Sequence, residues 1–206
     1  MESVGLYKLK YIDFIDAFNA VKLVSFRNLK GAYMKINHFI LIMLGVLIIS
    51  TPVLAHEGKA VIKGTAPDSM ISGEVILKHA EGGLSVEINV ANVPEGKHGI
   101  HFHENGSCED MGKAAGGHFN PDQVMHGFLP KDGAEHAHAG DMGNIDVAKD
   151  GTGSLKLFLP GVNLEEGSYA VKGKAIILHE KEDDMSQPTG NAGGRIGCGV
   201  IEVSEK

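Results

Sequence analysis

The chain has 206 residues, 43% of them hydrophobic, and a formal net charge of −7. From His56 onward it carries 13 basic and 23 acidic residues, a net charge of −10, which argues against binding to nucleic acid or to an anionic membrane. It has eleven histidines but only two cysteines. This composition argues against an iron–sulfur cluster or a zinc site built from thiolates.

The N-terminal part has the pattern of a secretory signal. Phe39–Ile49 is an unbroken apolar run, Lys35 precedes it, and a small residue, Ala55, ends the segment Val53-Leu54-Ala55. The run is too short to span a bilayer as a helix, although an uncleaved membrane anchor remains the alternative. Cleavage after Ala55 would leave 151 residues, enough for one domain.

Secretory signals usually begin a few residues before their charged region, and Met34-Lys35 would make such a start. We therefore expect a non-native extension in residues 1–33, a signal peptide in 34–55 and one domain in 56–206. The signal predicts a periplasmic or secreted protein that is free of the membrane after cleavage.

After the signal, the chain has the pattern of short strands separated by turns. Residues 84–90 alternate between apolar and polar, and turn-forming sequences such as Lys149-Asp150-Gly151 divide the apolar segments. The predicted strands are 60–64, 73–77, 84–90, 98–103, 143–147, 153–159, 172–178 and 199–203. No segment of 10–12 residues has a convincing helical stripe, so we expect an all-β sandwich or barrel of antiparallel strands.

Two segments lack strand character. Residues 104–140 are rich in Gly and His, and residues 180–197 are polar and contain four glycines. Structureless segments of this length inside a compact domain are usually functional. Both follow strands that end in candidate metal ligands.

Cys108 and Cys198 are the two cysteines, and both follow the signal. In an exported protein, two cysteines predict one disulfide; two reduced thiols are the alternative. Such a bridge would stabilise the fold by about 4–5 kcal/mol in the chain-entropy model.

Six histidines and one aspartate are spaced as in a two-metal site. His101 and His103 project from the same face of a strand, because residues i and i+2 of a strand face the same way. His118 and His179 could complete a first set. His126, His138 and Asp141 offer the nitrogen and oxygen ligands that suit zinc, if one histidine is shared between the sets. The pattern therefore indicates a copper or zinc centre with seven ligand residues.

All of these residues except His126 lie in longer motifs: GIHFHENGSC, GGHFNP, HAGDMGN, ILHEKEDD and GNAGGRIGCGVIE. The chain resembles the copper/zinc superoxide dismutases, and more closely their bacterial secreted, periplasmic type. The resemblance implies an eight-stranded antiparallel Greek-key sandwich or barrel with two long functional loops. It also implies an enzyme that converts superoxide to dioxygen and hydrogen peroxide and so protects against extracytoplasmic superoxide, with one copper and one zinc per chain.

The resemblance assigns a role to each residue. It makes Arg195 and His118 catalytic, and it pairs Cys108 with Cys198. Asp183 would connect the copper ligand His101 to the zinc ligand His126. The implied copper ligands are His101, His103, His118 and His179, and the implied zinc ligands are His118, His126, His138 and Asp141.

Several alternatives stay open. Asp183 could simply belong to a solvated acidic loop, and His136 could compete with His138 for zinc. His98 is expected to support the copper strand without binding metal, and His56 could chelate copper at a new N-terminus.

A copper store or chaperone, or a structural sandwich domain, could use the same scaffold. Residues 180–197 contain one lysine, Lys181, and Cys108 follows the His101-Phe102-His103 stretch closely. Both features fit the bacterial branch. They leave a homodimer open as an assembly, with its interface unspecified.

Overall fold

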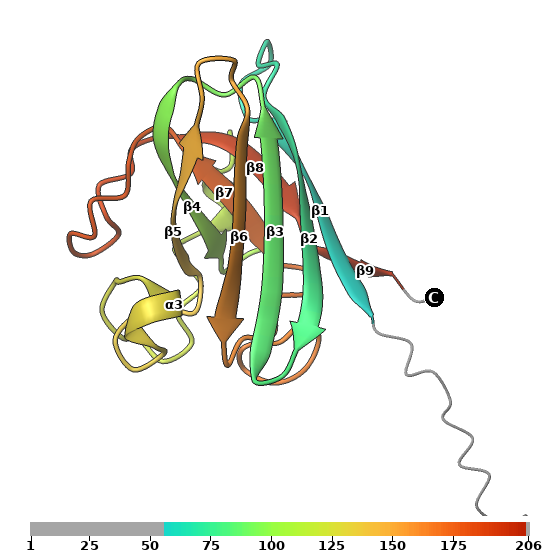
Figure 1. The fold of residues 1–206 in the computed structure, drawn as a ribbon, viewed down its shortest axis with the longest axis vertical. Coiled ribbons are helices and arrows are strands. Elements are labelled where there is room, and N and C mark those ends of the chain that lie inside the picture. The colour runs from blue at the N-terminus through green and yellow to red at the C-terminus, as the bar shows by residue number, and fades with distance from the viewer. Residues whose placement is uncertain (1–55, 205–206) are drawn as a thin grey trace, which may run out of the picture. The chain divides into compact units, whose positions relative to one another are not determined.

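The computed structural model describes residues 56–204, and Figure 1 shows their fold. The predicted extension in 1–33 and the predicted signal peptide in 34–55 lie outside the described residues. Within the described part, no helix is long and apolar enough to cross a membrane.

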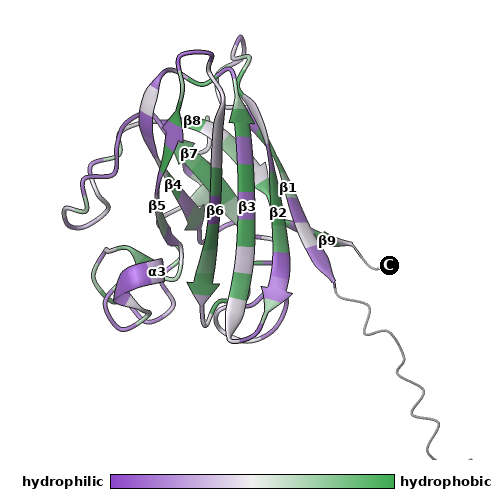
Figure 2. Cartoon of the chain, in the orientation of Figure 1, coloured by the Kyte–Doolittle hydropathy of each residue, from purple (hydrophilic) through white to green (hydrophobic). Residues whose placement is uncertain are grey.

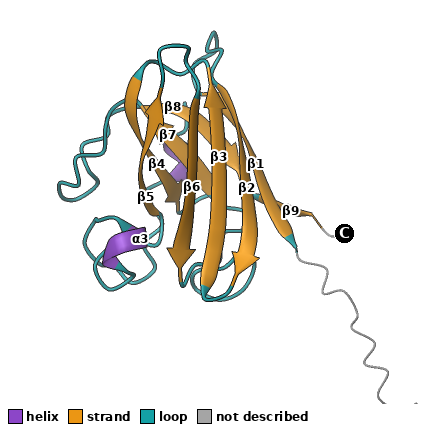
Figure 3. Ribbon diagram, viewed as in Figure 1, coloured by secondary structure: helices purple, strands orange, loops and turns teal. Residues whose placement is uncertain are grey.

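Strands and loops make up nearly all of residues 56–204 (Figure 3). Two short helical turns, η2 (Lys113–Ala115) and α3 (Leu129–Asp132), lie in the long loop between β4 and β5. The strands are β1 (Glu57–Gly64), β2 (Ser72–Ala80), β3 (Gly83–Ala91), β4 (Gly96–His103), β5 (Asp141–Val147), β6 (Gly153–Pro160), β7 (Ala175–His179), β8 (Arg195–Val200) and β9 (Glu202–Ser204).

The strands form one antiparallel sheet that closes on itself. Their order is β2-β3-β6-β5-β4-β7-β8-β1-β9, and the further pairing of β1 with β2 closes β1 to β8 into an eight-stranded barrel. β9 is an extra strand that pairs with Glu57–Lys59 of β1. The prediction of an all-β fold of eight antiparallel strands is confirmed. The closure is weakest between β5 and β6, which pair only at Val147 and Gly153.

Alternating side chains explain why the outer strands form. In β3, Leu84, Val86, Ile88 and Val90 are buried, while the residues between them are exposed or half-buried. Figure 2 shows the matching alternation of hydropathy along this strand. Each such burial contributes about 1.5–3 kcal/mol relative to exposure. The core of the barrel is built from these rows.

The strands beneath the candidate site are buried on both faces. All five residues of β7 and the last six of β4 are buried. Ile100 and Phe102 of β4 point into the core, so His101 and His103 lie on the opposite face of that strand. The two long loops cover this outer face. The histidines are therefore excluded from water although they lie outside the core.

Most strand boundaries differ from the sequence prediction by a few residues; β1, for example, begins at Glu57 and not at Ala60, and β2 ends at Ala80 and not at Leu77. The strand predicted at 172–178 begins at Ala175, because Lys174 N–H donates to the Val171 carbonyl in a turn. The last strand, predicted at 199–203, begins at Arg195 and breaks before β9. Arg195, Ile196 and Gly197 have the composition of a loop, but pairing of this segment with β7 extends the strand.

Candidate metal centre

Three strands and one loop bring the seven predicted ligands together. His101 and His103 come from β4, and His179 ends β7, which pairs with β4. His118 lies in the long loop and makes an isolated antiparallel bridge with His103. His126 and His138 come from the same loop, and Asp141 begins β5. All seven side chains are buried.

The first group is made of nitrogen atoms alone. One ring nitrogen each from His101, His103, His118 and His179 lies within 4.8 Å of the others. The Nε2 atoms of His103 and His179 are 3.4 Å apart. Two ligands 2.0–2.1 Å from one tetrahedral ion would be separated by about 3.3 Å. The spacing of these nitrogens therefore fits a single bound cation.

The second group centres on the carboxylate of Asp141. His118 Nδ1 and His138 Nδ1 lie 2.9 and 3.1 Å from Asp141 Oδ1, and His126 Nδ1 lies 2.8 Å from Oδ2. The backbone N–H groups of Gly127 and His138 donate to Oδ2 and fix the carboxylate. Three imidazole nitrogens around one carboxylate form a donor set that fits zinc.

His118 belongs to both groups. Its Nδ1 faces Asp141, which leaves Nε2 for the first group. Its ring centroid lies 4.0 Å from that of His101 and 5.5 Å from that of His138. One imidazole thus connects the two sets of donors.

Hydrogen bonds on the far side of each ring orient the free nitrogens. His103 Nδ1 lies 3.0 Å from the Gly116 carbonyl oxygen, and His101 Nε2 lies 2.8 Å from Asp183 Oδ2. His126 Nε2 lies 3.0 and 3.1 Å from the two oxygens of Asp183. Metal-binding histidines typically donate their second N–H in this way. The buried Nδ1 atom of His101 has no hydrogen-bond partner among the described residues, as expected for a nitrogen that faces a metal.

The protonation of the histidines also favours metal binding. Burial, followed by the neighbouring His118, lowers the pKa of His103 to about 2, and burial followed by His101 lowers that of His179 to about 3. Burial outweighs the hydrogen bond to Asp141 and lowers the pKa of His118 to about 4. These imidazoles are therefore neutral at pH 7, which is the form that binds metals.

The second group has the opposite electrostatics. Burial alone would lower the pKa of His126, but hydrogen bonds to Asp141 and Asp183 raise it to about 9. Burial alone would raise the pKa values of the two carboxyls, but their histidine partners hold both well below the usual range. Both carboxylates are therefore ionised, and they favour a cation at this position.

Arg195 lies next to the first group. It opens β8 opposite His179, and it is half-buried. One guanidinium nitrogen, Nη1, donates to the Gly112 carbonyl, and Nη2 donates to the Gly116 carbonyl. Two carbonyls therefore hold the planar guanidinium in one orientation and leave its positive charge unpaired by any carboxylate in the described part.

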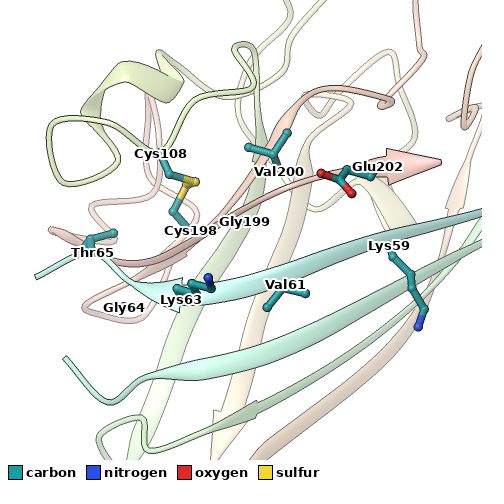
Figure 4. A pocket seen from close by; sticks show the side chains of 10 residues that line it. All are labelled: Lys59, Val61, Lys63, Gly64, Thr65, Cys108, Cys198, Gly199, Val200 and Glu202. Carbon is teal, nitrogen blue, oxygen red and sulfur yellow. A yellow bond between two sulfur atoms is a disulfide. The ribbon is translucent and has the colours of Figure 1, made fainter. Parts of the chain in front are cut away.

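A disulfide joins the segment that holds Arg195 to β8. Cys108 and Cys198 are bonded, with their Cα atoms 5.7 Å apart. A cavity of about 470 Å³ lies outside the disulfide, between β1 and β8 (Figure 4). The sulfur atoms and Lys63 and Thr65 line it, and none of the seven candidate ligands does. This cavity is separate from the metal centre.

The other histidines of residues 56–204 take no part in the two groups. His136 is exposed, whereas His138 lies among the donors, and His79 is exposed on β2. His98 is buried with its ring between the carbonyl oxygens of His179 and Pro94, so it supports the end of β7. His56 contacts Glu165.

The sequence analysis assigns no role to three further residues of the site, although two of them, Asn144 and Gly190, lie in the quoted motifs. Asn144 and Gln187 hold the backbones of Asp183 and His126 with their side-chain amides. Gly190 has a φ of +73°, and a Cβ there would lie 1.8 Å from Asp183 Oδ1. Their roles depend on contacts between loops that are far apart in sequence.

The fold and the two donor groups define a class: a closed antiparallel β-barrel with two adjacent groups of potential metal ligands that share one imidazole. The chain belongs to the copper/zinc superoxide dismutase family, whose model matches residues 71–201. It is 38% identical to Cu-Zn superoxide dismutase 5 of Dictyostelium discoideum over 154 residues, covering 70% of this chain and 96% of that protein.

Further relatives agree with the family. The extracellular Cu-Zn superoxide dismutase of Haemonchus contortus is 36% identical, with 69% of this chain and 79% of that protein covered. The extracellular enzyme of Drosophila melanogaster is 35% identical, with coverages of 66% and 78%. A crystal structure of the clock protein EA4 superposes with a TM-score of 0.64 at 32% identity, covering 72% of this chain and 94% of that one. The chain is an enzyme of this family: it dismutes superoxide, and copper and zinc are its metals.

Proposed function

We propose that the first group holds the copper and the second the zinc, one of each per chain, with His118 shared between them. The membership of His118 in both groups supports this most directly. Four imidazoles suit copper, and a carboxylate beside three imidazoles suits zinc. The ligands are His101, His103, His118 and His179 for copper, and His118, His126, His138 and Asp141 for zinc.

Bound copper supplies the one-electron exchange that takes one superoxide to dioxygen and the next to hydrogen peroxide, and zinc supplies a fixed positive charge. Arg195 binds the superoxide anion through the guanidinium N–H groups that do not donate to the Gly112 and Gly116 carbonyls. His118 holds and delivers a proton at Nε2, because its Nδ1 stays directed at the zinc group. Asp183 fixes the orientation of the His101 and His126 rings through its hydrogen bonds to both.

The shared imidazole can be tested by spectroscopy. Protein loaded with Cu(II) and with Co(II) in place of zinc should show magnetic coupling between the ions, seen as loss of the copper EPR signal. In His118→Ala the copper signal should return, because no ring would connect the ions. An undiminished copper signal in the unmutated protein would contradict the shared ligand. Superoxide consumption with and without a chelator, measured on the same sample, tests the activity itself.

We also propose an exported protein of the bacterial periplasmic type, cut after Ala55 so that residues 56–206 form the mature enzyme and residues 1–33 are not made. The signal pattern supports export, and two of the relatives are named extracellular. The short stretch from His103 to Cys108 and the single lysine in 180–197 support the bacterial type. Cells that express the whole chain should release a protein with His56 at its N-terminus into the periplasm.

For partners, we propose superoxide alone among small molecules, with no nucleic acid and no membrane after cleavage. The net charge of −10 in residues 56–206 supports both exclusions. A homodimer is the proposed assembly, and sedimentation equilibrium at several concentrations would detect it. A monomer at all concentrations would contradict it without affecting the metal assignments.

A further inference from the structure

The backbone of His126 is held by a side chain from the other long loop. His126 N–H donates to Gln187 Oε1 at 3.0 Å, and Gln187 Nε2 donates to the His126 carbonyl at 2.8 Å. The Gln187 amide therefore satisfies both the N–H and the carbonyl of the His126 backbone, as a neighbouring strand would. Among the described residues, His126 has no other backbone hydrogen bond.

The segment around His126 is held by few further contacts: the Asn120 side chain bonds the Val124 backbone, and Gly127 N–H donates to Asp141 Oδ2. It has no regular secondary structure, and the adjacent Met125 is 65% exposed. His138 and Asp141, by contrast, are connected by a backbone hydrogen bond at the start of β5. His126 is thus the zinc-group residue that most depends on a distant contact for its placement.

Gln187 is itself well placed to act as a fixed support. The turn that carries it is closed by hydrogen bonds from Asp184 N–H to the Gly190 carbonyl and from Gly190 N–H to the Ser186 carbonyl. The Asn191 amide adds bonds to the side chains of Asp184 and Ser186. Since Gln187 is exposed overall, its role lies in these two amide contacts and not in filling the core.

The same arrangement occurs once more on the partner of His126. Asn144 of β5 accepts from Asp183 N–H at 2.7 Å and donates to the Asp183 carbonyl at 2.9 Å. Asp183 in turn contacts the rings of His101 and His126. Two amides, one from the barrel and one from the loop, thus fix the two backbones whose side chains meet between the metal groups.

We propose that Gln187 is a positioning residue for zinc retention: it clamps the His126 backbone and thereby holds the ring in the zinc group. The inference rests on the proposed assignment of His126 as a zinc ligand. Supports behind metal ligands typically change metal affinity 10- to 100-fold when removed. In the described part of the chain, the Gln187 amide bonds only the His126 backbone and no residue of the copper group, so we expect the effect to fall mainly on zinc.

Zinc release from the fully loaded protein, followed with a chromophoric chelator, provides the test. Gln187→Ala loses both contacts. Gln187→Asn keeps the amide on a side chain that is one methylene shorter, so the amide cannot reach the N–H and carbonyl of His126. Both should release zinc about tenfold faster, with copper release within about twofold of wild type. Thr189→Ala, an exposed change in the same loop, is the matched control and should behave as wild type.

A spectroscopic readout separates positioning from general loosening. With Co(II) in the zinc group, Gln187→Ala should alter the cobalt absorption bands, because the geometry of His126 around the ion changes. Unchanged zinc release, or equal acceleration of zinc and copper release, would overturn the inference. His126→Ala tests the assignment separately: if it binds zinc as tightly as wild type, the ligand assignment fails, whatever Gln187 does.

Discussion

Arg195 is the only arginine in residues 56–206, in a segment of net charge −10. Two backbone carbonyls fix its guanidinium, so its charge stays at one point near the copper group. Net charge and local field are different quantities, and a small anion close to the metal responds mainly to the nearest fixed charge. An acidic protein can therefore serve an anionic substrate.

Arg195→Ala should lower kcat/KM for superoxide by roughly 10- to 100-fold, because a hydrogen bond to a charged group contributes about 1.5–3 kcal/mol. Arg195→Glu should be slower still, because it adds repulsion at the docking point. Arg195→Lys keeps the charge but cannot bond both carbonyls, and it should fall between wild type and Ala. Superoxide consumption is measured alongside copper and zinc content. Full activity of the Glu variant with copper bound would disprove the proposed docking role.

At the scale of single elements, the loop from β7 to β8 depends on a glycine. At Gly190, φ is +73° and a Cβ would overlap Asp183 Oδ1. Gly190→Ala should therefore cost about 1–2 kcal/mol of backbone strain and also displace Asp183 from His101 and His126.

Gly161→Ala is the control for this variant. Gly161 has a φ of +75°, and a Cβ added there would have no atom within 4 Å, so this variant should show the strain alone. Thermal unfolding and zinc content distinguish the two variants. Equal melting temperatures and equal zinc content would show that Asp183 tolerates the displacement.

The disulfide acts at the same scale, since it ties β8 to the segment whose carbonyls hold Arg195. Cys198→Ser should lower the free energy of unfolding by about 4 kcal/mol, and it should also reduce activity as the carbonyls move away from Arg195. Calorimetry and superoxide consumption on metal-loaded protein measure both effects. A melting temperature unchanged by full reduction would contradict this prediction.

The sequence predicts some elements better than others, for physical reasons. The alternation of β3 reflects burial of one face, which is a local pattern, and its predicted range is nearly correct. The start of β8 at Arg195 depends on pairing with β7, which local composition does not contain. Six of the seven proposed metal ligands lie in the motifs quoted above, and His126 is the exception. Gln187 lies in no motif, and the motif that contains Asn144 does not reveal its role, because the contacts of these two residues span 61 and 39 residues of sequence.

For the molecule as a whole, the buried histidines predict how stability of the metal-free protein depends on pH. The pKa values of His103, His118 and His179 are lowered to about 2, 4 and 3 from 6.5. Below pH 6.5 these histidines bind protons in the unfolded chain but not in the folded chain, so the free energy of unfolding falls as pH falls. The raised pKa of His126, about 9, acts in the other direction, and its contribution is lost as pH rises from 6.5 through 9.

These groups together should place the stability maximum of the metal-free protein near pH 6.5, with a decline on both sides. Urea unfolding at a series of pH values measures this. Metal loading should flatten the dependence and raise the melting temperature, because bound ions replace protons as the partners of these side chains. Monotonic stability between pH 4 and 9 in the metal-free protein would show that other groups dominate.

His118 belongs to both donor groups, and this has a thermodynamic consequence. When one ring serves two ions, occupancy at one position changes the binding free energy at the other. Such an interdependence is reciprocal: whatever factor zinc imposes on copper affinity, copper imposes on zinc affinity. The order in which the ions arrive cannot alter the total binding free energy. The order decides only which singly loaded species is populated on the way. It therefore decides which partly loaded form of the protein accumulates when either metal is scarce.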